Sequence, residues 1–108
     1  MKKYTLIASR DTFESKEAEH YLDLAAELKR AGNDVTLFLV QNGVLAARQS
    51  SASARLSKLA EAGVAVLADS FSLRERGIVS GRLAVGVRSA ELETVVDHMA
   101  EGRKVLWN

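Results

Sequence analysis

The side chains best suited to chemistry in this chain are concentrated in one segment, VAVLADSFSLRERGI (Val64–Ile78). An apolar run there reaches Asp69 and Ser70, and Arg74 and Arg76 follow closely. Ligands and catalytic groups of α/β proteins collect at the ends of strands, and this segment places an acid, hydroxyls and arginines there. The arginines could bind an anion, and the carboxylate could act as an acid, a base or a nucleophile. The chain has no cysteine, so thiol chemistry is excluded.

Basic side chains are concentrated in the middle of the chain. The whole sequence of 108 residues carries a net charge of only +1, which gives no argument for nucleic acid as a partner. Residues 41–90 nevertheless carry seven basic side chains against three acidic ones, and six of the seven are arginine. A local positive field of this size suits an anionic small molecule or an acidic partner surface. The alternative is a set of solvated side chains on ordinary loops.

An alternation of amphipathic helices, single glycines and apolar runs predicts the fold. Three times the chain reads helix, glycine, strand, at Gly32, Gly63 and Gly102, and this order is typical of parallel strands joined by crossover helices. We expect one domain over residues 1–108, a three-layer α/β/α arrangement with a mainly parallel sheet of about four to five strands, as in flavodoxin-like folds. The predicted strands are Lys3–Ala8, Asp34–Val40, Val64–Ala68 and Lys104–Trp107, and the predicted helices are Ser15–Ala31, Ser50–Ala62 and Ala90–Glu101.

Each of the last two helices is expected to turn one apolar face to the core. Ser89 is a suitable N-cap for the last helix. The segment Leu83–Val87 stays open between a fourth strand and a loop, because the glycines around it favour irregular structure. The expected inward residues are Ala52, Leu56, Leu59 and Ala60 in the second helix, and Leu92, Val95, Val96 and Met99 in the last.

Several kinds of site are excluded because the residues they need are missing. The loop after the first strand, SRDTFESK, has neither the dinucleotide glycine pattern nor a phosphate-binding P-loop. A receiver-type phosphorylation site needs an acidic pair in that loop to hold Mg²⁺, but Asp11 stands alone beside Arg10. No serine lies in a G-x-S-x-G elbow. His20 and His98 lie on polar helix faces and are expected to be solvated, so no metal site and no cofactor is predicted.

Nothing in the sequence directs the chain into a membrane. No apolar run approaches the roughly 18 residues of a membrane span, and the N-terminal MKKYTLIASRD resembles a strand more than a signal peptide. We therefore expect a cytoplasmic protein with neither a membrane nor a nucleic acid as partner. Phe71 and Trp107 are candidate interface residues, with core or edge packing as the alternative.

Three segments, in this order, resemble the DsrE-like family of small sulfur-relay proteins (the DsrE/DsrF/DsrH and TusBCD type). They are VTLFLVQNGV, GVAVLADSFSLRERGI and VVDHMAEGRKVLW. The resemblance covers nearly the whole chain and implies the same α/β fold. In the sulfur-carrying members a cysteine at the end of the third strand holds a persulfide. Counting back from Arg76 and Gly77 places Asp69 at that position, within a residue.

The aspartate at this position cannot carry sulfane sulfur, because a persulfide forms on a nucleophilic thiolate. The resemblance therefore implies a member that keeps the scaffold and lacks the chemistry of a sulfurtransferase. Family subunits without the cysteine serve inside oligomeric relay complexes, and members assemble as dimers, trimers or hexamers. The resemblance thus implies a homo-oligomer, and a cysteine-bearing DsrE-like protein or a sulfurtransferase as a partner.

Three functions stay open on the sequence alone. The first is a non-catalytic structural or docking subunit near intracellular sulfur transfer. The second is a module that binds a small anion or a nucleotide, because parallel strands bring their loops to one edge of the sheet. The third is an enzyme that uses Asp69 as an acid, a base or a nucleophile, a role that the adjacent arginines oppose. The candidate ligand or partner residues are Arg10, Asn42, Gly43, Arg48, Asp69, Ser70, Arg74 and Arg76.

Overall fold

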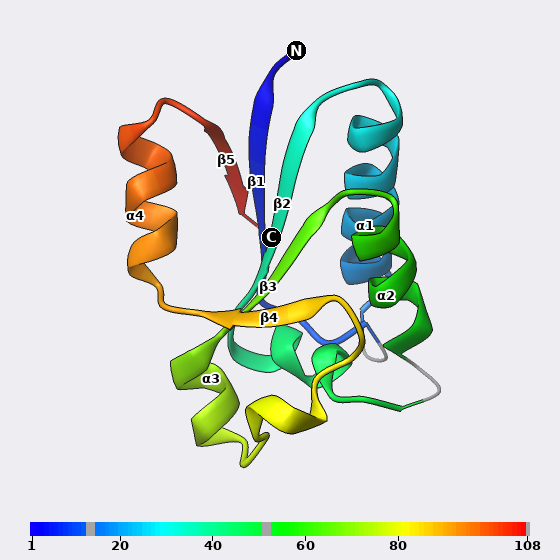
Figure 1. Ribbon diagram of the computed structural model, residues 1–108, viewed down its shortest axis with the longest axis vertical. Helices are drawn as coiled ribbons and strands as arrows, with labels where there is room; N and C mark the ends of the chain where they lie inside the picture. The colour runs from blue at the N-terminus through cyan, green and yellow to red at the C-terminus, as the bar shows by residue number, and fades with distance from the viewer. Residues whose placement is uncertain (13–14, 51–52, 108) are drawn as a thin grey trace.

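A parallel sheet forms the centre of the computed structural model, which describes residues 1–12, 15–50 and 53–107. Within these residues five strands form a single sheet whose neighbouring strands all run parallel (Figure 1). The spatial order is β4-β3-β2-β1-β5, so the chain adds strands toward one edge and then returns to place the last strand beside the first. The strands are β1 (Lys3–Ala8), β2 (Asp34–Leu39), β3 (Ala65–Asp69), β4 (Val87–Ala90) and β5 (Lys104–Trp107).

Helices cover the two faces of the sheet unequally. α1 and α2 lie against one face, and α4 lies on the other (Figure 1). The strand order explains this, because the return from β4 to β5 runs against the direction of the earlier connections, and a right-handed crossover then places its helix on the opposite face. In the described residues the α-helices are α1 (Lys16–Arg30), α2 (Ala54–Glu61), α3 (Ser70–Glu75) and α4 (Glu93–Ala100), and the 3₁₀ helices are η1 (Gln41–Ala47) and η3 (Ser80–Arg82).

The larger core lies between the sheet and the layer of α1 and α2. Side chains of a strand alternate between faces, so Leu6 and Ala8 of β1 belong to this core. β2 is buried on both faces from Val35 to Leu39, as expected for a central strand with a nearly continuous apolar run. The smaller core under α4 consists of Ile7, Phe38, Val40 and Val95.

The predicted fold class is confirmed, and each predicted strand agrees with the observed one to within one residue. α1 begins after Ser15, whose hydroxyl accepts a hydrogen bond from the backbone N–H of Ala18 at 3.3 Å. The helix is followed by Gly32 at a φ of +92°, in the left-handed region that glycine adopts without strain. The helix, glycine, strand pattern was therefore a sound guide to the topology.

The second helix begins later than the apolar pattern predicts. The hydroxyl of Ser53 accepts from the backbone N–H of Ser50 at 3.1 Å and donates to the carbonyl oxygen of Ser50 at 2.7 Å. α2 itself runs from Ala54 to Glu61. Of the predicted inward residues, Leu56 and Leu59 are buried, Ala60 is partly buried, and Ala52 lies outside the described residues.

The prediction that Ser89 caps the last helix is wrong. Ser89 and Ala90 belong to β4, which pairs with β3, and α4 begins only at Glu93. The segment Leu83–Val87 contributes only its last residue to this strand, which follows Gly86 at a φ of +89°. Parallel pairing with β3 satisfies the backbone groups that an extra helical turn would otherwise have satisfied.

α4 turns most of its apolar residues away from the core, which also corrects the prediction. Leu92, Val96 and Met99 are 53%, 61% and 56% exposed, and Val95 is the buried member of the predicted set. Their spacing places the three exposed residues along one flank of the helix, which we call the α4 stripe. The helix rests on the sheet through Val95 and His98, so the α4 stripe faces solvent.

Candidate functional site

The carboxyl ends of β2 and β3 border a cavity of about 360 Å³, which we call the Asp69 pocket. Asp69 is the last residue of β3, and α3 follows it directly. The strand end that the sequence singled out therefore lines a cavity. Its other walls are Val40, Gln41, Phe71, Ser72, Glu75, Arg76, Leu92 and Trp107.

The carboxylate of Asp69 is used to hold α3 in place. Asp69 is only 6% exposed, and its Oδ2 accepts hydrogen bonds from the backbone N–H of Ser72 at 3.0 Å and from the hydroxyl of Ser72 at 2.7 Å. This is the geometry of an N-cap. The carboxylate thus has a structural role at the position where the sequence raised a chemical one.

A second hydrogen bond ties this cap to the end of β2. The hydroxyl oxygen of Ser72 accepts from the backbone N–H of Gln41 at 2.8 Å. Gln41 has a φ of +50°, which is uncommon for a residue other than glycine and is costly unless the surroundings hold it. The chain of hydrogen bonds from Gln41 through Ser72 to Asp69 joins two neighbouring strand ends across the pocket.

Arg76 is held at the rim of the pocket by uncharged oxygens. Its Nε and Nη2 donate to the Oδ1 of Asn42 at 3.2 and 3.0 Å, and its Nη1 donates to the carbonyl oxygen of Ser72 at 3.3 Å. None of these acceptors carries a charge, so no carboxylate is paired with the guanidinium through these bonds. Asn42 of η1 is thus brought next to the segment that runs from Asp69 through α3 to Arg76.

The other predicted site residues lie elsewhere. Arg10 makes an exposed ion pair with Glu17 at 3.4 Å, which is worth little in water. Gly43 is buried against the end of β1. Ser70 and Arg74 line a different cavity on the other side of α3.

Replacing Asp69 by alanine is expected to lower the free energy of unfolding by about 1–2 kcal/mol, because α3 loses its cap and the Ser72 hydroxyl its acceptor. Asp69→Asn keeps an acceptor oxygen and should lose less. The exposed acid Glu75 of the same helix gives the matched control, Glu75→Gln. Urea unfolding of the three variants measures the difference, and equal stabilities for Asp69→Ala and Glu75→Gln would contradict the capping role.

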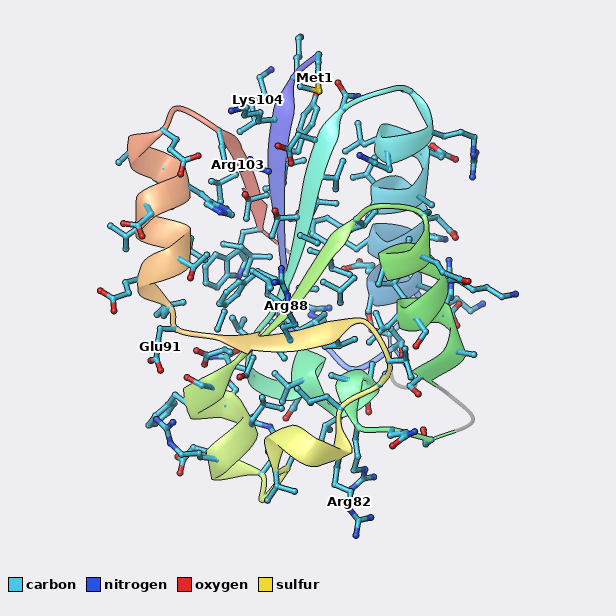
Figure 2. All side chains as sticks on the ribbon, in the orientation of Figure 1. Met1, Arg82, Arg88, Glu91, Arg103 and Lys104 are labelled. Carbon is cyan, nitrogen blue, oxygen red and sulfur yellow. The ribbon has the colours of Figure 1, made fainter. Side chains whose placement is uncertain are left out.

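A second polar cluster lies under α4, at the amino ends of the strands. The side chain of Arg103 is 5% exposed, and its Nε donates to the Oγ1 of Thr5 at 3.0 Å. Its Nη2 reaches the carbonyl oxygen of Tyr4 at 2.8 Å, the carboxylate of Asp34 at 3.1 Å and the Oγ1 of Thr36 at 3.3 Å. Figure 2 labels Arg103 beside β1. The cluster joins β1, β2 and β5 and is built as an anchor, far from the Asp69 pocket along the strands.

His98 extends this cluster, which corrects its prediction as a solvated surface residue. The Oγ1 of Thr5 lies 2.7 Å from its Nδ1. The same oxygen accepts from Arg103, so the hydroxyl of Thr5 joins His98 to the guanidinium, and the direction of its bond to His98 depends on the imidazole tautomer. Burial, and next the charge of Arg103, lower the pKa of His98, against the opposing pull of nearby carboxylates. His20, by contrast, is exposed as predicted.

The protein is expected to lose stability as the pH falls below about 6.5, the ordinary pKa of histidine. The folded pKa of His98 is lowered, so the unfolded chain binds a proton first, and the stabilisation present at neutral pH is lost as the pH falls through the folded pKa. Urea unfolding between pH 7.5 and about pH 5 measures this loss. His98→Gln should flatten the profile and His20→Gln should not. The same slope in both variants would assign the loss to other groups.

Sequence reasoning missed Gln41 in the pocket and Arg103 in the anchor. Gln41 gives no signal, because a left-handed glutamine is held by its surroundings and not by its own preference. Arg103 follows Gly102 and looks like an ordinary solvated residue at a helix end. The place of Trp107 at the Asp69 pocket could have been predicted, because the parallel register sets this residue beside Ile7, near the carboxyl end of β1.

Metal binding and membrane-spanning helices were also considered for the described residues. No group of three or more His, Asp or Glu side chains in residues 1–12, 15–50 and 53–107 is arranged to hold a metal ion. Over the same residues, no helix has both the length and the apolar character needed to cross a membrane.

The parallel sheet with helices on both faces, and a pocket at the carboxyl ends of its central strands, define a doubly wound α/β protein. Within this class, the chain belongs to the DsrE/DsrF-like family, whose model matches residues 2–107. No curated protein matches the chain.

Solved structures share the fold, among them the following three. The YchN protein from E. coli is 24% identical, with a TM-score of 0.89 and all of both chains covered. MTH1491 from Methanobacterium thermoautotrophicum is 19% identical, with a TM-score of 0.75 over 98% of this chain and 99% of that one. BT1422 from Bacteroides thetaiotaomicron is 14% identical, with a TM-score of 0.77 over 98% and 95%. The last two are described as proteins of unknown function, so these likenesses support the fold alone.

Proposed function

We propose that this protein is a non-catalytic member of its family, a structural or docking subunit that works beside a cysteine-bearing sulfur carrier in the cytoplasm. The observation that carries the proposal is Asp69. It occupies the strand end where sulfur-carrying relatives are expected to hold their cysteine, and its carboxylate is bound by Ser72. A persulfide needs a thiolate, and the chain has no cysteine to supply one.

An acid-base role for Asp69 is less well supported than a docking role. One oxygen of the carboxylate already accepts two hydrogen bonds from Ser72, and removing it from that position would uncap α3. The residue is also buried, with 6% of its surface exposed. A group fixed in this way is suited to holding the pocket in shape.

An exposed apolar surface supports the docking role. Phe71 and Trp107 are 60% and 64% exposed, and with Leu92 they line the Asp69 pocket. The α4 stripe continues from Leu92 along the helix. Large apolar side chains gathered on a surface mark interaction sites more often than isolated ones do. We propose that another DsrE-like subunit covers this surface, either a second copy in a dimer, trimer or hexamer, or a cysteine-bearing relative.

Sedimentation velocity tests the docking role, with the chain alone and mixed with a cysteine-bearing DsrE-like protein in its persulfide form. We expect a complex in at least one of the two samples. Phe71→Ser/Trp107→Ser should weaken it at least about tenfold, because buried aromatic residues dominate interface energies. Val79→Ser/Val85→Ser is the matched control, since Val79 and Val85 are 62% and 76% exposed and are not walls of the Asp69 pocket. A monomer in both samples would overturn the docking role.

Bound sulfane sulfur, released by cyanide, tests the non-catalytic part of the proposal. After exposure to polysulfide and desalting, the natural chain should hold no such sulfur, whereas Asp69→Cys should hold up to one atom per chain. The gain in the variant would support the correspondence between Asp69 and the sulfur-carrying cysteine. Transfer of sulfur to an acceptor thiol, accelerated by the natural chain on its own, would contradict a non-catalytic role.

A further inference from the structure

α3 separates two cavities with different chemistry. Ser70, Leu73, Arg74 and Gly77 follow the spacing of one helical face and line a cavity of about 500 Å³, whereas the Asp69 pocket is lined from the other side of α3. Val79 and Ile78 from the following loop and Ser89 from β4 complete this second cavity. We call it the Ser70 cavity.

The hydroxyl of Ser70 is a polar group without a partner. Its Oγ is buried and has no hydrogen bond to any of the described residues. A buried hydroxyl left in this state costs free energy, so native structures rarely keep one without a reason. Because Ser70 lines the cavity, a rotation about its χ1 angle can present this hydroxyl to a bound molecule.

The charge of the Ser70 cavity is positive. Arg74 is the charged residue among its described walls, and no carboxylate belongs to them. The guanidinium of Arg74 makes no hydrogen bond or ion pair with the described residues, in contrast to that of Arg76, which is held by Asn42. The guanidinium of Arg74 is therefore free to bind a ligand, and the hydroxyl of Ser89 is exposed on the opposite wall.

The remaining walls are apolar. Leu73 and Ile78 are buried core residues whose side chains also border the cavity, and Val79 is 62% exposed beside them. Apolar walls with a few converging polar groups are typical of a small-molecule site. An inorganic ion would leave these walls in contact with water, so they favour a ligand that has an apolar part.

We propose that the Ser70 cavity binds a small organic anion. Its phosphate or carboxylate group is bound by the guanidinium of Arg74 and the hydroxyls of Ser70 and Ser89. Its apolar part packs against Leu73 and Ile78. Such a site is independent of sulfur transfer and of the apolar docking surface, because it uses the opposite side of α3.

Phenyl phosphate and benzoate are suitable probes, titrated separately into ¹⁵N-labelled protein and followed by NMR. We expect saturable shifts at the amides of Gly77, Ile78 and Ser89 for at least one of the two, with a Kd of about 1 mM or tighter. Phenol and inorganic phosphate, the two halves of the first probe, should each bind at least about tenfold more weakly. The preference between the two probes identifies the acidic group.

Two variants and one control complete the test. Arg74→Gln should raise the Kd of the probe about tenfold, since a charge-assisted hydrogen bond is lost. Ser70→Ala should weaken binding as well, yet raise the Tm of the free protein, because an unpartnered buried hydroxyl is removed. Arg82 is exposed and points away from the rest of the molecule, so Arg82→Gln should bind as the natural chain does (Figure 2).

The proposal is overturned if neither probe gives saturable shifts, or if Arg74→Gln and Arg82→Gln bind equally well. These measurements use the chain alone and no sulfur donor. Their failure would leave the docking role intact, and failure of the docking role would leave this site intact.

Discussion

Replacing Gly43 by alanine is expected to lower the free energy of unfolding by about 3 kcal/mol, because the added methyl group has no room. A Cβ at Gly43 would lie 2.2 Å from the backbone carbonyl oxygen of Ala8, well inside any contact that real atoms make. For a domain of this size such a loss corresponds to a fall in Tm on the order of 15 °C. Thermal and urea unfolding measure both quantities.

The backbone around Gly43 cannot easily move to relieve the clash. The carbonyl oxygen of Ala8 accepts a hydrogen bond from the N–H of Val40 at 3.0 Å, and the N–H of Gly43 donates to the carbonyl oxygen of Val40 at 2.9 Å. Both bonds fix the segment from the end of β2 into η1. A shift there also moves Asn42, which holds Arg76 at the Asp69 pocket. The variant should therefore disturb the pocket as well as the stability.

Gly81→Ala is the matched control. Gly81 also lies in a 3₁₀ helix, has no positive φ, and has nothing within 4 Å of the position its Cβ would take. Alanine there should change the stability by less than about 1 kcal/mol, and in the favourable direction, because it restricts the unfolded chain. If the Gly43 and Gly81 variants proved equally stable, the close approach of η1 to β1 would be refuted.

The strands and the topology could be predicted because their signals are local. A glycine after each helix and an apolar run after each glycine fixed β2, β3 and β5 to within one residue. β4 could not be found in this way. Its residues Val87–Ala90 are strand because β3 offers a parallel partner, and this depends on chain more than ten residues away. Because β4 was not predicted, the last helix was predicted to begin too early, at Ala90.

The prediction of which α4 residues face the core was wrong for a related reason. A helical pattern identifies which residues share a face, but the number of neighbours decides how much of that face is covered. α4 lies on the face of the sheet opposite α1 and α2, where Val95 is buried while the α4 stripe is exposed. The error is informative, because apolar residues that a sequence assigns to the core and a fold leaves exposed mark a surface for a partner.

The candidate site, too, could be predicted from the sequence only in part. The position of Asp69 at a strand end follows from the sequence, because an apolar run ends there before a helical segment. Its hydrogen bonds to Ser72, and the link from Ser72 to Gln41, arise only when two separate strand ends meet. The sequence therefore located the pocket, while the role of its acid depended on contacts made in the folded chain.

Replacing Arg103 by methionine is the second change with a large expected effect, a loss of about 3 kcal/mol in the free energy of unfolding. The variant keeps the apolar length of the side chain but removes the donors to Thr5, Tyr4 and Thr36, whose oxygens lie under α4. Lysine should not rescue it fully, because a single ammonium group cannot match the directions of the guanidinium donors. Arg82→Met, at an exposed site, should cost less than about 0.5 kcal/mol.

Two titrations distinguish a specific anchor from a general loss of packing. The hydrogen bond from Arg103 lowers the pKa of Asp34 despite some opposing burial, so the Arg103→Met variant should raise this pKa toward its usual value. The charge of Arg103 is the second cause, after burial, that lowers the pKa of His98, so this pKa should rise too. NMR titration of the folded variant measures both. Unchanged values for both groups would refute the anchor. If they rise, the loss of stability below pH 6.5 should become smaller, because the folded and unfolded states of His98 then take up their proton at closer pH values.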